Sequence, residues 1–402
     1  MRPDELRRDF LRHVCQTSPA PLAIVVARAE GATIWDADGR AYLDLLSGIG
    51  VANIGHGHPD VVAAVRAQAE RYLHVMVYGE AVEEPQVRLA QRLAELAPGD
   101  LSVVYFCNSG TEAIEGAVKL ARKATRRLRL VAFRGGYHGD TMGALSLCDS
   151  TVYRAPFEPL LGDVEFLPFD DPAALARIDE RVAAVVVEPI QGEGGVRVPG
   201  ADFLPALRAR CDATGALLIF DEVMTGCGRT GSWFACQQWG VTPDVLVLAK
   251  ALGGGLPLGA FVGRPELMAT LSHDPPLAHV TTFGGHPLSC AAGLAALEVA
   301  TRERLPERAA AVGDGWRAHL RAALGDVLVD VRGRGMLIGL ELASPRQTEA
   351  FCRAAFERGL ILNWTLHRDT VVRLAPPLTI SDADSDRALT AITASLRDAE
   401  RP

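Results

Sequence analysis

Two charged residues in this chain stand where a short apolar run ends. Lys250 directly follows the apolar residues 245–249, and Asp221 directly follows residues 216–220. Burial at a strand end disfavours the ammonium form of a lysine, and a lowered pKa is what a Schiff-base lysine needs. A plainer interpretation of Lys250, a head group that reaches solvent, stays open. A carboxylate at position 221 could orient a histidine, bind a metal or hold a proton on a pyridine nitrogen.

The metal alternative for Asp221 lacks further ligands in the sequence. His56 and His58 are the one close histidine pair, and they precede Pro59 in a glycine-rich turn. The eight cysteines are scattered and form no Cys-x-x-Cys pair, which argues against both a metal site and a disulfide framework. We therefore expect no bound metal and an intracellular protein with reduced thiols.

A Ser-Gly-Thr sequence at residues 109–111 lies between a strand candidate and a helix candidate. Free backbone N–H groups at a helix start, together with a hydroxyl, form a cradle for a phosphate. An ordinary serine cap explains the same residues, so both interpretations stay open. No Gly-Lys-Ser/Thr sequence occurs, which excludes a P-loop. The glycines of residues 333–339 are spaced one residue too widely for a dinucleotide fingerprint and precede a strand.

The elements that must position these residues follow from the apolar pattern. From about residue 101, short runs rich in β-branched residues alternate with segments of helical periodicity, which predicts an α/β fold with a mainly parallel sheet flanked by helices. In such sheets, ligands bind at the carboxyl ends of the strands. The strand candidates are residues 103–107, 129–133, 182–187, 216–220, 245–249 and 260–262, and polar residues follow five of them, at 108–111, 135–138, 188, 221–222 and 250.

The C-terminal part has a different character, with short strand candidates among helical stretches. We expect three parts: an N-terminal segment, residues 1–48, that packs with the small domain; a large domain, residues 49–299; and a small α+β domain, residues 300–402. An Asp-Gly turn signal at residues 38–39 predicts a hairpin over residues 35–44. The C-terminal strand candidates are residues 330–331, 336–341, 360–363 and 371–374, with a helix over 348–358.

The composition narrows the class of protein. The 402 residues carry 41 Lys and Arg against 49 Asp and Glu, a net charge of −8, which argues against a nucleic-acid binder. Hydrophobic residues make up 49% and charged residues 22%, as in ordinary globular proteins. No apolar run approaches the ~18–20 residues of a membrane span, and the N-terminus lacks an apolar signal core. We expect a cytoplasmic protein without a nucleic-acid or membrane partner.

Taken in order, the motifs resemble the class III family of pyridoxal-phosphate aminotransferases, the group that includes ornithine, acetylornithine and 4-aminobutyrate aminotransferases. The resemblance implies the fold-type I architecture, with a large domain built on a seven-stranded type of sheet, and pyridoxal 5′-phosphate as cofactor. It runs over nearly the whole chain, at residues 35–44, 48–51, 55–59, 108–113, 137–139, 188–195, 221–223, 225–226, 228–231, 249–251, 282–285 and 373–378.

The resemblance also implies roles for single residues. Lys250 would form a Schiff base with the cofactor aldehyde and then carry the migrating proton, and Asp221 would keep the pyridine nitrogen protonated. Thr282 would reach the cofactor phosphate of the neighbouring subunit, which implies a homodimer. The remaining cofactor-binding residues would be Ser109, Gly110 and Thr111 at the phosphate, Tyr137 and Val223 on the two ring faces, and His138 and Glu188 beside them.

For the substrates, the resemblance implies that Arg373 grips the carboxylate of a keto acid such as 2-oxoglutarate. Glu193 would pair with that arginine when the reacting substrate end has no carboxylate, and Thr281 would also contact substrate. Asp140 stands where acetylornithine and 4-aminobutyrate members carry an arginine; at this position the chain resembles diaminopelargonate aminotransferase instead. Met224 replaces a glutamine that many relatives have at the cofactor's phenolic oxygen.

These departures shape the expected function. We expect an ω-type aminotransferase whose donor, an amine or amino acid, lacks a distal carboxylate that an arginine would recognise, because Asp140 would repel one. A racemase, aminomutase or decarboxylase on the same fold stays open as an alternative, since fold and lysine do not select the bond that breaks. A cofactor-binding homologue without turnover is the third alternative.

Overall fold

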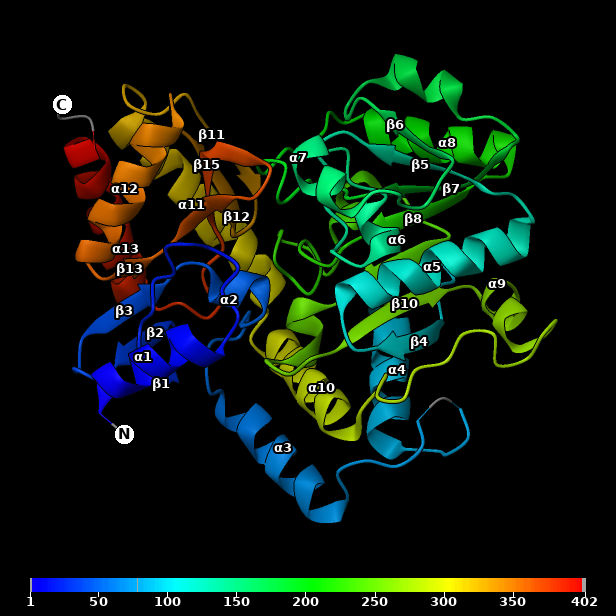
Figure 1. The fold of residues 1–402 in the computed structure, drawn as a ribbon, viewed down its shortest axis with the longest axis horizontal. Coiled ribbons are helices and arrows are strands. Elements are labelled where there is room, and N and C mark those ends of the chain that lie inside the picture. Colours follow the sequence, from blue (N-terminus) through cyan, green and yellow to red (C-terminus); the bar gives the residue numbers. More distant parts are fainter. Residues whose placement is uncertain (1, 78, 400–402) are drawn as a thin grey trace.

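The computed structural model describes residues 2–77 and 79–399. Its described part contains a seven-stranded sheet with the order β4-β10-β9-β8-β7-β5-β6 (Figure 1). β10 is antiparallel to both of its neighbours, whereas the pairs β9–β8, β8–β7, β7–β5 and β5–β6 are parallel. The prediction of a mainly parallel sheet is therefore confirmed. The strands are β4 (Val103–Cys107), β5 (Arg129–Phe133), β6 (Val164–Leu167), β7 (Val182–Val187), β8 (Leu217–Asp221), β9 (Val245–Leu248) and β10 (Gly259–Gly263).

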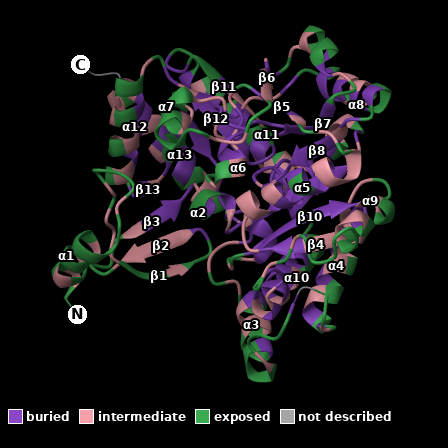
Figure 2. Ribbon diagram, turned by 45° about the vertical axis from the view of Figure 1, so that its right-hand side comes forward, coloured by how far each residue is buried: buried purple, intermediate pink, exposed green. Residues whose placement is uncertain are grey.

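These strands form because their sequences are short, apolar and rich in valine and isoleucine, residues that pack well on a pleated surface. All six residues of β7 are buried, as are all residues of β9 and β10, and Figure 2 shows β7, β8 and β10 in the buried colour. β6 was not predicted: it is a four-residue edge strand with only its last residue buried. β8 includes Asp221, which the sequence placed just after the strand.

Helices cover both faces of the sheet, and successive strand residues point to opposite sides. One apolar cluster joins Leu130 to the buried face of α5 (Gly110–Thr125). The other joins Val131 to residues of α4 (Glu84–Leu96), α8 (Phe203–Thr214) and α10 (Pro287–Arg302). The arrangement leaves the carboxyl ends of the parallel strands free of helix packing. The other helices before α10 are α1 (Pro3–His13), α2 (Ser47–Gly50), α3 (Pro59–Arg71), α6 (Met142–Leu145), α7 (Thr151–Arg154) and α9 (Pro265–Ala269).

The N-terminal and C-terminal segments lie together beside the large sheet (Figure 1). The predicted hairpin is confirmed, because β2 and β3 pair antiparallel around a turn in which Asp36 accepts hydrogen bonds from the N–H groups of Asp38 and Arg40. β3 then pairs in parallel with β13, so an N-terminal strand shares a sheet with a C-terminal one. The three-part division itself stays a prediction. The strands of this sheet are β1 (Val26–Glu30), β2 (Thr33–Asp36), β3 (Ala41–Asp44) and β13 (Leu360–Ile361).

A further sheet in the C-terminal part has the order β11-β12-β15-β14. The prediction of one strand over residues 360–363 is wrong: β13 pairs with β3, and the chain passes through Leu362 into β14, which pairs antiparallel with β15. No helix within the described residues has the length and apolarity that a membrane crossing needs. The elements are α11 (Leu305–Leu324), β11 (Asp330–Arg334), β12 (Leu337–Glu341), α12 (Pro345–Glu357), β14 (Asn363–Thr365), β15 (Arg368–Leu374) and α13 (Asp382–Ala399).

Candidate active site

A cavity of about 670 Å³ opens at the carboxyl ends of β4, β5, β7, β8 and β9. Parallel strands present these ends at one edge of the sheet, which is why residues far apart in the sequence meet there. All five polar strand ends singled out in the sequence contribute to its wall. They do so through Asn108, Ser109, Gly110, Thr111, Tyr137, His138, Asp140, Glu188, Asp221 and Lys250.

Lys250 begins a 3-10 turn directly after β9 and projects into this cavity. Its backbone has a left-handed φ of 49°, a strained conformation for a residue with a side chain. Burial lowers the pKa of Lys250, and the charge of Arg373 lowers it further, against the charges of Glu193, Asp221 and Glu188. A lysine with a lowered pKa is nucleophilic at neutral pH. Its ammonium contacts the Met224 sulfur at 3.8 Å.

A buried acid–base cluster surrounds Asp221 at the end of β8. One carboxylate oxygen lies 2.7 Å from Nδ1 of His138, and the other accepts the N–H of Val223 at 3.1 Å. Burial lowers the pKa of His138, but the hydrogen bond and charge of Asp221 and the charge of Glu188 outweigh it and raise the pKa. Glu188 accepts the N–H groups of Tyr137 and Gly192, and burial raises the pKa of Glu188 to about 8. Of the roles left open for Asp221, orienting a histidine is thus present in the structure.

The Ser-Gly-Thr segment forms the first turn of α5 at the cavity wall. Ser109 caps the helix by accepting the N–H of Glu112 at 3.3 Å, so the plainer interpretation of this residue holds. Gly110 has no room for a side chain, since a Cβ there would lie 3.0 Å from Val223. The hydroxyl of Thr111 lies 2.7 Å from that of Thr141. The first-turn N–H groups and these hydroxyls therefore face the cavity together with the positive end of the helix dipole, as a phosphate cradle requires.

Tyr137 and Asp140 lie on the solvent side of the cavity. The tyrosine hydroxyl donates a hydrogen bond of 2.8 Å to a carboxylate oxygen of Asp140, and burial together with this carboxylate raises the tyrosine pKa. Asp140 is exposed and makes no ion pair with any residue that the structure describes. Its charge is therefore available to a molecule that enters the cavity.

Glu193 lines the cavity and forms an ion pair with Arg373 of β15. Arg373 is only 4% exposed and does not itself line the cavity. Burial raises the pKa of Glu193, but the charge and hydrogen bond of Arg373 and the N–H of Leu366 outweigh it and lower the pKa. The Leu366 N–H donates to the carboxylate at 2.8 Å, and the His367 N–H donates to the Glu193 carbonyl at 3.0 Å.

Thr281 and Thr282 lie outside this chain's cavity wall. Thr281 accepts a hydrogen bond of 3.2 Å from the amide of Asn108, which does line the cavity, and Thr282 is exposed. Thr282 is therefore not among the residues that line the cavity of its own chain.

Sequence reasoning missed several contributors to the site. Thr141 follows directly on the motif that carries Asp140 and joins Thr111 to Glu115. The turn at Leu366 belongs to a different sheet, and no local pattern linked it to Glu193. The apolar wall also includes Val51, Ile190, Leu256, Pro257 and Leu258, of which the last three follow a run of glycines that signalled a loop beside Lys250.

The donor set of the cavity fits pyridoxal phosphate. A phosphate would meet the α5 cradle at Gly110 and Thr111, an aldehyde would meet Lys250, and a pyridine nitrogen would meet the buried carboxylate of Asp221. Tyr137 and Val223 supply flat and apolar surface beside them. Among the described residues no group of three His, Cys, Asp or Glu side chains is arranged to hold a metal ion.

Comparison with known proteins gives consistent matches over the whole chain. The family model of class-III aminotransferases matches residues 14–396. An acetylornithine aminotransferase of Methanopyrus kandleri is 44% identical over 96% of this chain and 97% of its own. A putrescine aminotransferase of Pectobacterium atrosepticum is 42% identical over 90% of this chain and 80% of its own. The ornithine aminotransferase structure from Toxoplasma gondii, which holds PLP at partial occupancy, superposes with a TM-score of 0.93 at 34% identity, over 99% of this chain and 95% of that one.

Proposed function

The chain belongs to the class-III aminotransferases, and on that premise we propose that its amino donor is a diamine, with 2-oxoglutarate or another keto acid as acceptor. It is a pyridoxal-phosphate-dependent transaminase with a fold-type I architecture. Racemisation, aminomutation and decarboxylation on the same fold find no support among the relatives, which are named aminotransferases.

Asp140 carries the donor proposal. It is an exposed carboxylate on the cavity wall, bonded to the Tyr137 hydroxyl and without a cationic partner among the described residues. Two unit charges about 4 Å apart interact by about 1 kcal/mol in water, and by more as the site closes. Attraction of a distal ammonium and repulsion of a distal carboxylate therefore separate the two donor classes by about 2 kcal/mol, or about thirtyfold in kcat/KM. The name of the Pectobacterium relative, a putrescine aminotransferase, supports the same class of donor.

Acetylornithine is the rival donor, because the Methanopyrus relative is named for it. Acetylornithine carries a carboxylate at the end remote from its free amine. Binding that end favourably needs a cation at the cavity wall, and this chain places Asp140 there. The charge at this position therefore separates the two candidates.

We assign the reaction steps to this chain's own groups as follows. Pyridoxal phosphate, when bound, supplies an aldehyde that condenses with amines and a ring that accepts an electron pair. Gly110 and Thr111 would hold the phosphate, with Ser109 capping the helix behind them, and Asp221 would keep a proton on the pyridine nitrogen. Lys250 Nζ would take the proton from the carbon that bears the donor's amino group and deliver it to the carbon of the cofactor's aldehyde group. His138 and Glu188 act through Asp221, whose carboxylate they orient and surround.

Carboxylate recognition in the proposed function divides between Arg373 and Glu193. Arg373 binds the carboxylate of the keto acid with two parallel hydrogen bonds, as its planar guanidinium allows. When a diamine reacts, no carboxylate arrives, and Glu193 neutralises the buried arginine as it does in the structure. A buried charge without a partner is costly, which is why a switch of partners is needed.

We also propose a homodimer, in which Thr282 reaches the cofactor phosphate of the second subunit and Thr281 lies near the substrate. The exposure of Thr282 and its absence from its own cavity wall support this assignment.

The test of the proposed function is a donor panel for wild type, Asp140→Arg and Asp140→Asn, with glutamate formation from 2-oxoglutarate as the readout. We expect wild type to prefer putrescine and related diamines to acetylornithine. Asp140→Arg should reverse the preference, and Asp140→Asn, which removes the charge alone, should lie between them. Good use of acetylornithine by wild type, with no gain in Asp140→Arg, would refute the charge argument.

A further inference from the structure

A second cavity, of about 280 Å³, is lined in part by Gly194, which directly follows Glu193. Three arginines and two carboxylates line it. They come from the loop after β7, from the segment after β6 and from three strands of the C-terminal part: Arg197, Arg332, Arg368, Asp170 and Glu341.

Two of the arginines already share one carboxylate. Arg332 bonds one oxygen of Glu341 at 2.5 Å, and Arg368 bonds the other at 2.7 Å. Arg332 also pairs with Asp330 at 3.0 Å. Both oxygens of Glu341 are therefore engaged and do not neutralise a third guanidinium.

Arg197 is the third guanidinium, and it makes no ion pair with any residue that the structure describes. Its contacts are the Gln191 side-chain oxygen at 3.3 Å, the Phe169 carbonyl at 3.4 Å and the face of the Phe169 ring. Burial lowers the pKa of Arg197, and the charges of Arg332 and Arg368 add to this effect, against that of Asp170. A half-buried cation held among other cations at long hydrogen-bond distances calls for an anion.

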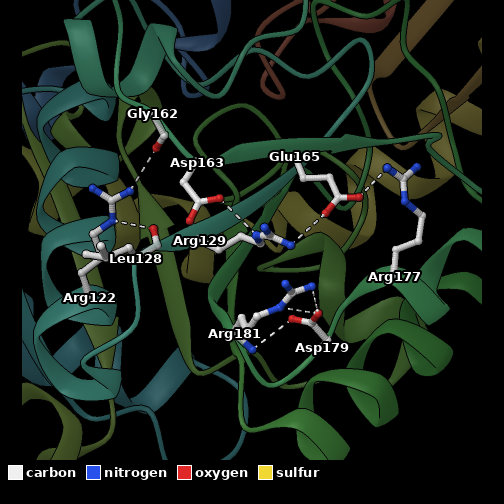
Figure 3. Close-up of polar contacts among 9 residues, drawn as sticks. All are labelled: Arg122, Leu128, Arg129, Gly162, Asp163, Glu165, Arg177, Asp179 and Arg181. Atoms are coloured by element: carbon white, nitrogen blue, oxygen red, sulfur yellow. Dashed lines mark hydrogen bonds and ion pairs between the residues drawn. The ribbon is translucent and has the colours of Figure 1, made fainter.

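A cluster of arginines does not by itself indicate an anion site, as the arginines at the edge of the large sheet show (Figure 3). At the edge of the large sheet, Arg129 pairs with Asp163, Arg177 with Glu165, and Arg181 with Asp179. These three guanidinium groups each have a carboxylate, whereas Arg122 in the same view donates to the carbonyls of Leu128 and Gly162. Arg197 differs from Arg129, Arg177 and Arg181 in lining a cavity without a carboxylate at ion-pair distance among the described residues.

We propose that the cavity around Arg197 binds a small oxyanion of the phosphate type. Guanidinium groups match oxyanions with paired hydrogen bonds, and Arg197 is the guanidinium at this cavity that no carboxylate engages among the described residues. The cavity volume accommodates inorganic phosphate, sulfate or a small polycarboxylate. The Phe169 ring and the Gly194 backbone complete its wall.

The site is joined to carboxylate recognition in the first cavity. Arg332 donates two hydrogen bonds, of 2.9 and 2.7 Å, to the carbonyl of Gly195, two residues after Glu193. Arg368 directly follows the turn whose N–H groups bind Glu193. An anion that draws these arginines toward Arg197 therefore acts on both segments that hold Glu193. We therefore expect the anion to change the affinity for the keto acid acceptor, and by linkage the acceptor to change the affinity for the anion.

The experiment uses the holoenzyme with excess pyridoxal phosphate, so that the first cavity's phosphate cradle is filled. Binding of inorganic phosphate, sulfate and citrate is measured by calorimetry at constant ionic strength. The variants are Arg197→Gln, Arg197→Lys and the matched control Arg177→Gln, which removes one arginine charge elsewhere. We expect saturable binding to wild type, a loss of about tenfold or more in Arg197→Gln, a smaller loss in Arg197→Lys and none in Arg177→Gln.

Two results overturn the site: no saturable binding to wild type, or equal binding to wild type and Arg197→Gln. Binding that weakens as pyridoxal phosphate is raised belongs to the first cavity and overturns it as well. The coupling rests on the proposed function and has its own readout, a change in acceptor KM with phosphate in wild type that is absent in Arg197→Gln. Saturable, Arg197-dependent binding by an enzyme that rejects diamines supports the site and refutes the proposed donor.

Discussion

The ion pair between Glu193 and Arg373 predicts opposite changes in the two halves of the transamination. Both side chains are largely buried, and the second Glu193 oxygen accepts the Leu366 N–H. Glu193→Gln keeps the size of the side chain and an oxygen for Leu366. It removes the negative charge that Arg373 faces, so the arginine has no ion-pair partner until a substrate carboxylate binds.

The magnitude follows from what each substrate must do. A keto acid has to displace Glu193 from Arg373, and a hydrogen bond between charged groups contributes about 1.5–3 kcal/mol. Removing that competitor should lower the acceptor KM by about tenfold to a hundredfold. A diamine donor brings no carboxylate and meets a buried, unpaired guanidinium, so we expect its kcat/KM to fall by a similar factor. The same unpaired charge should destabilise the fold by about 3 kcal/mol.

The assay measures the two half-reactions separately by stopped-flow absorbance, with amine alone and with keto acid alone, and stability by urea unfolding. Glu165→Gln is the matched control, because Glu165 also pairs with arginines but lies far from the cavity. We expect the control to leave both half-reactions unchanged. If Glu193→Gln weakens or improves both the donor and the acceptor half-reaction, Arg373 does not exchange Glu193 for the acceptor carboxylate, and the reasoning fails.

Three further predictions concern the centre of the cavity. Lys250→Ala should abolish transfer and remove the borohydride-fixed cofactor, which peptide mapping of reduced wild type should place on the Lys250 peptide. Asp221→Asn removes the negative charge that helps to raise the pKa of His138, so this pKa should fall in the apoprotein, as followed by NMR; an unchanged titration would contradict the pairing. Burial raises the pKa of Glu188 to about 8, whereas an unfolded glutamate titrates near 4.3, so the unfolded chain binds fewer protons between these values. The unfolding free energy of the wild-type apoprotein should therefore fall as pH rises from about 5 to about 8, and Glu188→Gln should flatten that slope in urea unfolding.

The large sheet could be predicted from the sequence because its signals are local. Runs such as β7, with six buried residues in succession, need no knowledge of their partners to be recognised as strands of a parallel sheet. The placement of Lys250 and Asp221 at one edge then follows from strand direction alone. β6 was not predicted because an edge strand with three half-buried residues has a weaker apolar pattern.

Contacts between distant segments could not be predicted in the same way. The sequence left three roles open for Asp221, and only the fold shows that the loop after β5 brings His138 to it at 2.7 Å. The single strand expected over residues 360–363 fails for a related reason, since its two halves pair with strands of different sheets. In both cases the partner is distant in the chain: His138 lies 83 residues before Asp221, and β3 lies even farther before β13.

Acceptor recognition depends most on such distant contacts, because Arg373 of the C-terminal sheet meets the cavity through its ion pair with Glu193 of the large domain. Arg229, fully buried, holds that junction with hydrogen bonds to the carbonyls of Met336 at 3.1 Å and Pro376 at 2.5 Å and to the Asn53 side chain at 2.5 Å. Burial lowers the pKa of Arg229 to about 9, and the charge of Arg373 contributes in the same direction. Pro376 lies three residues after Arg373, so this guanidinium fixes the strand end that sets the acceptor's binding group. The residues for the cofactor chemistry thus lie at strand ends of the large sheet, whereas the residue for acceptor binding is positioned by the contact between the C-terminal sheet and the large domain. We therefore expect substitutions at this contact to change acceptor specificity although none of them alters a residue of the cavity wall.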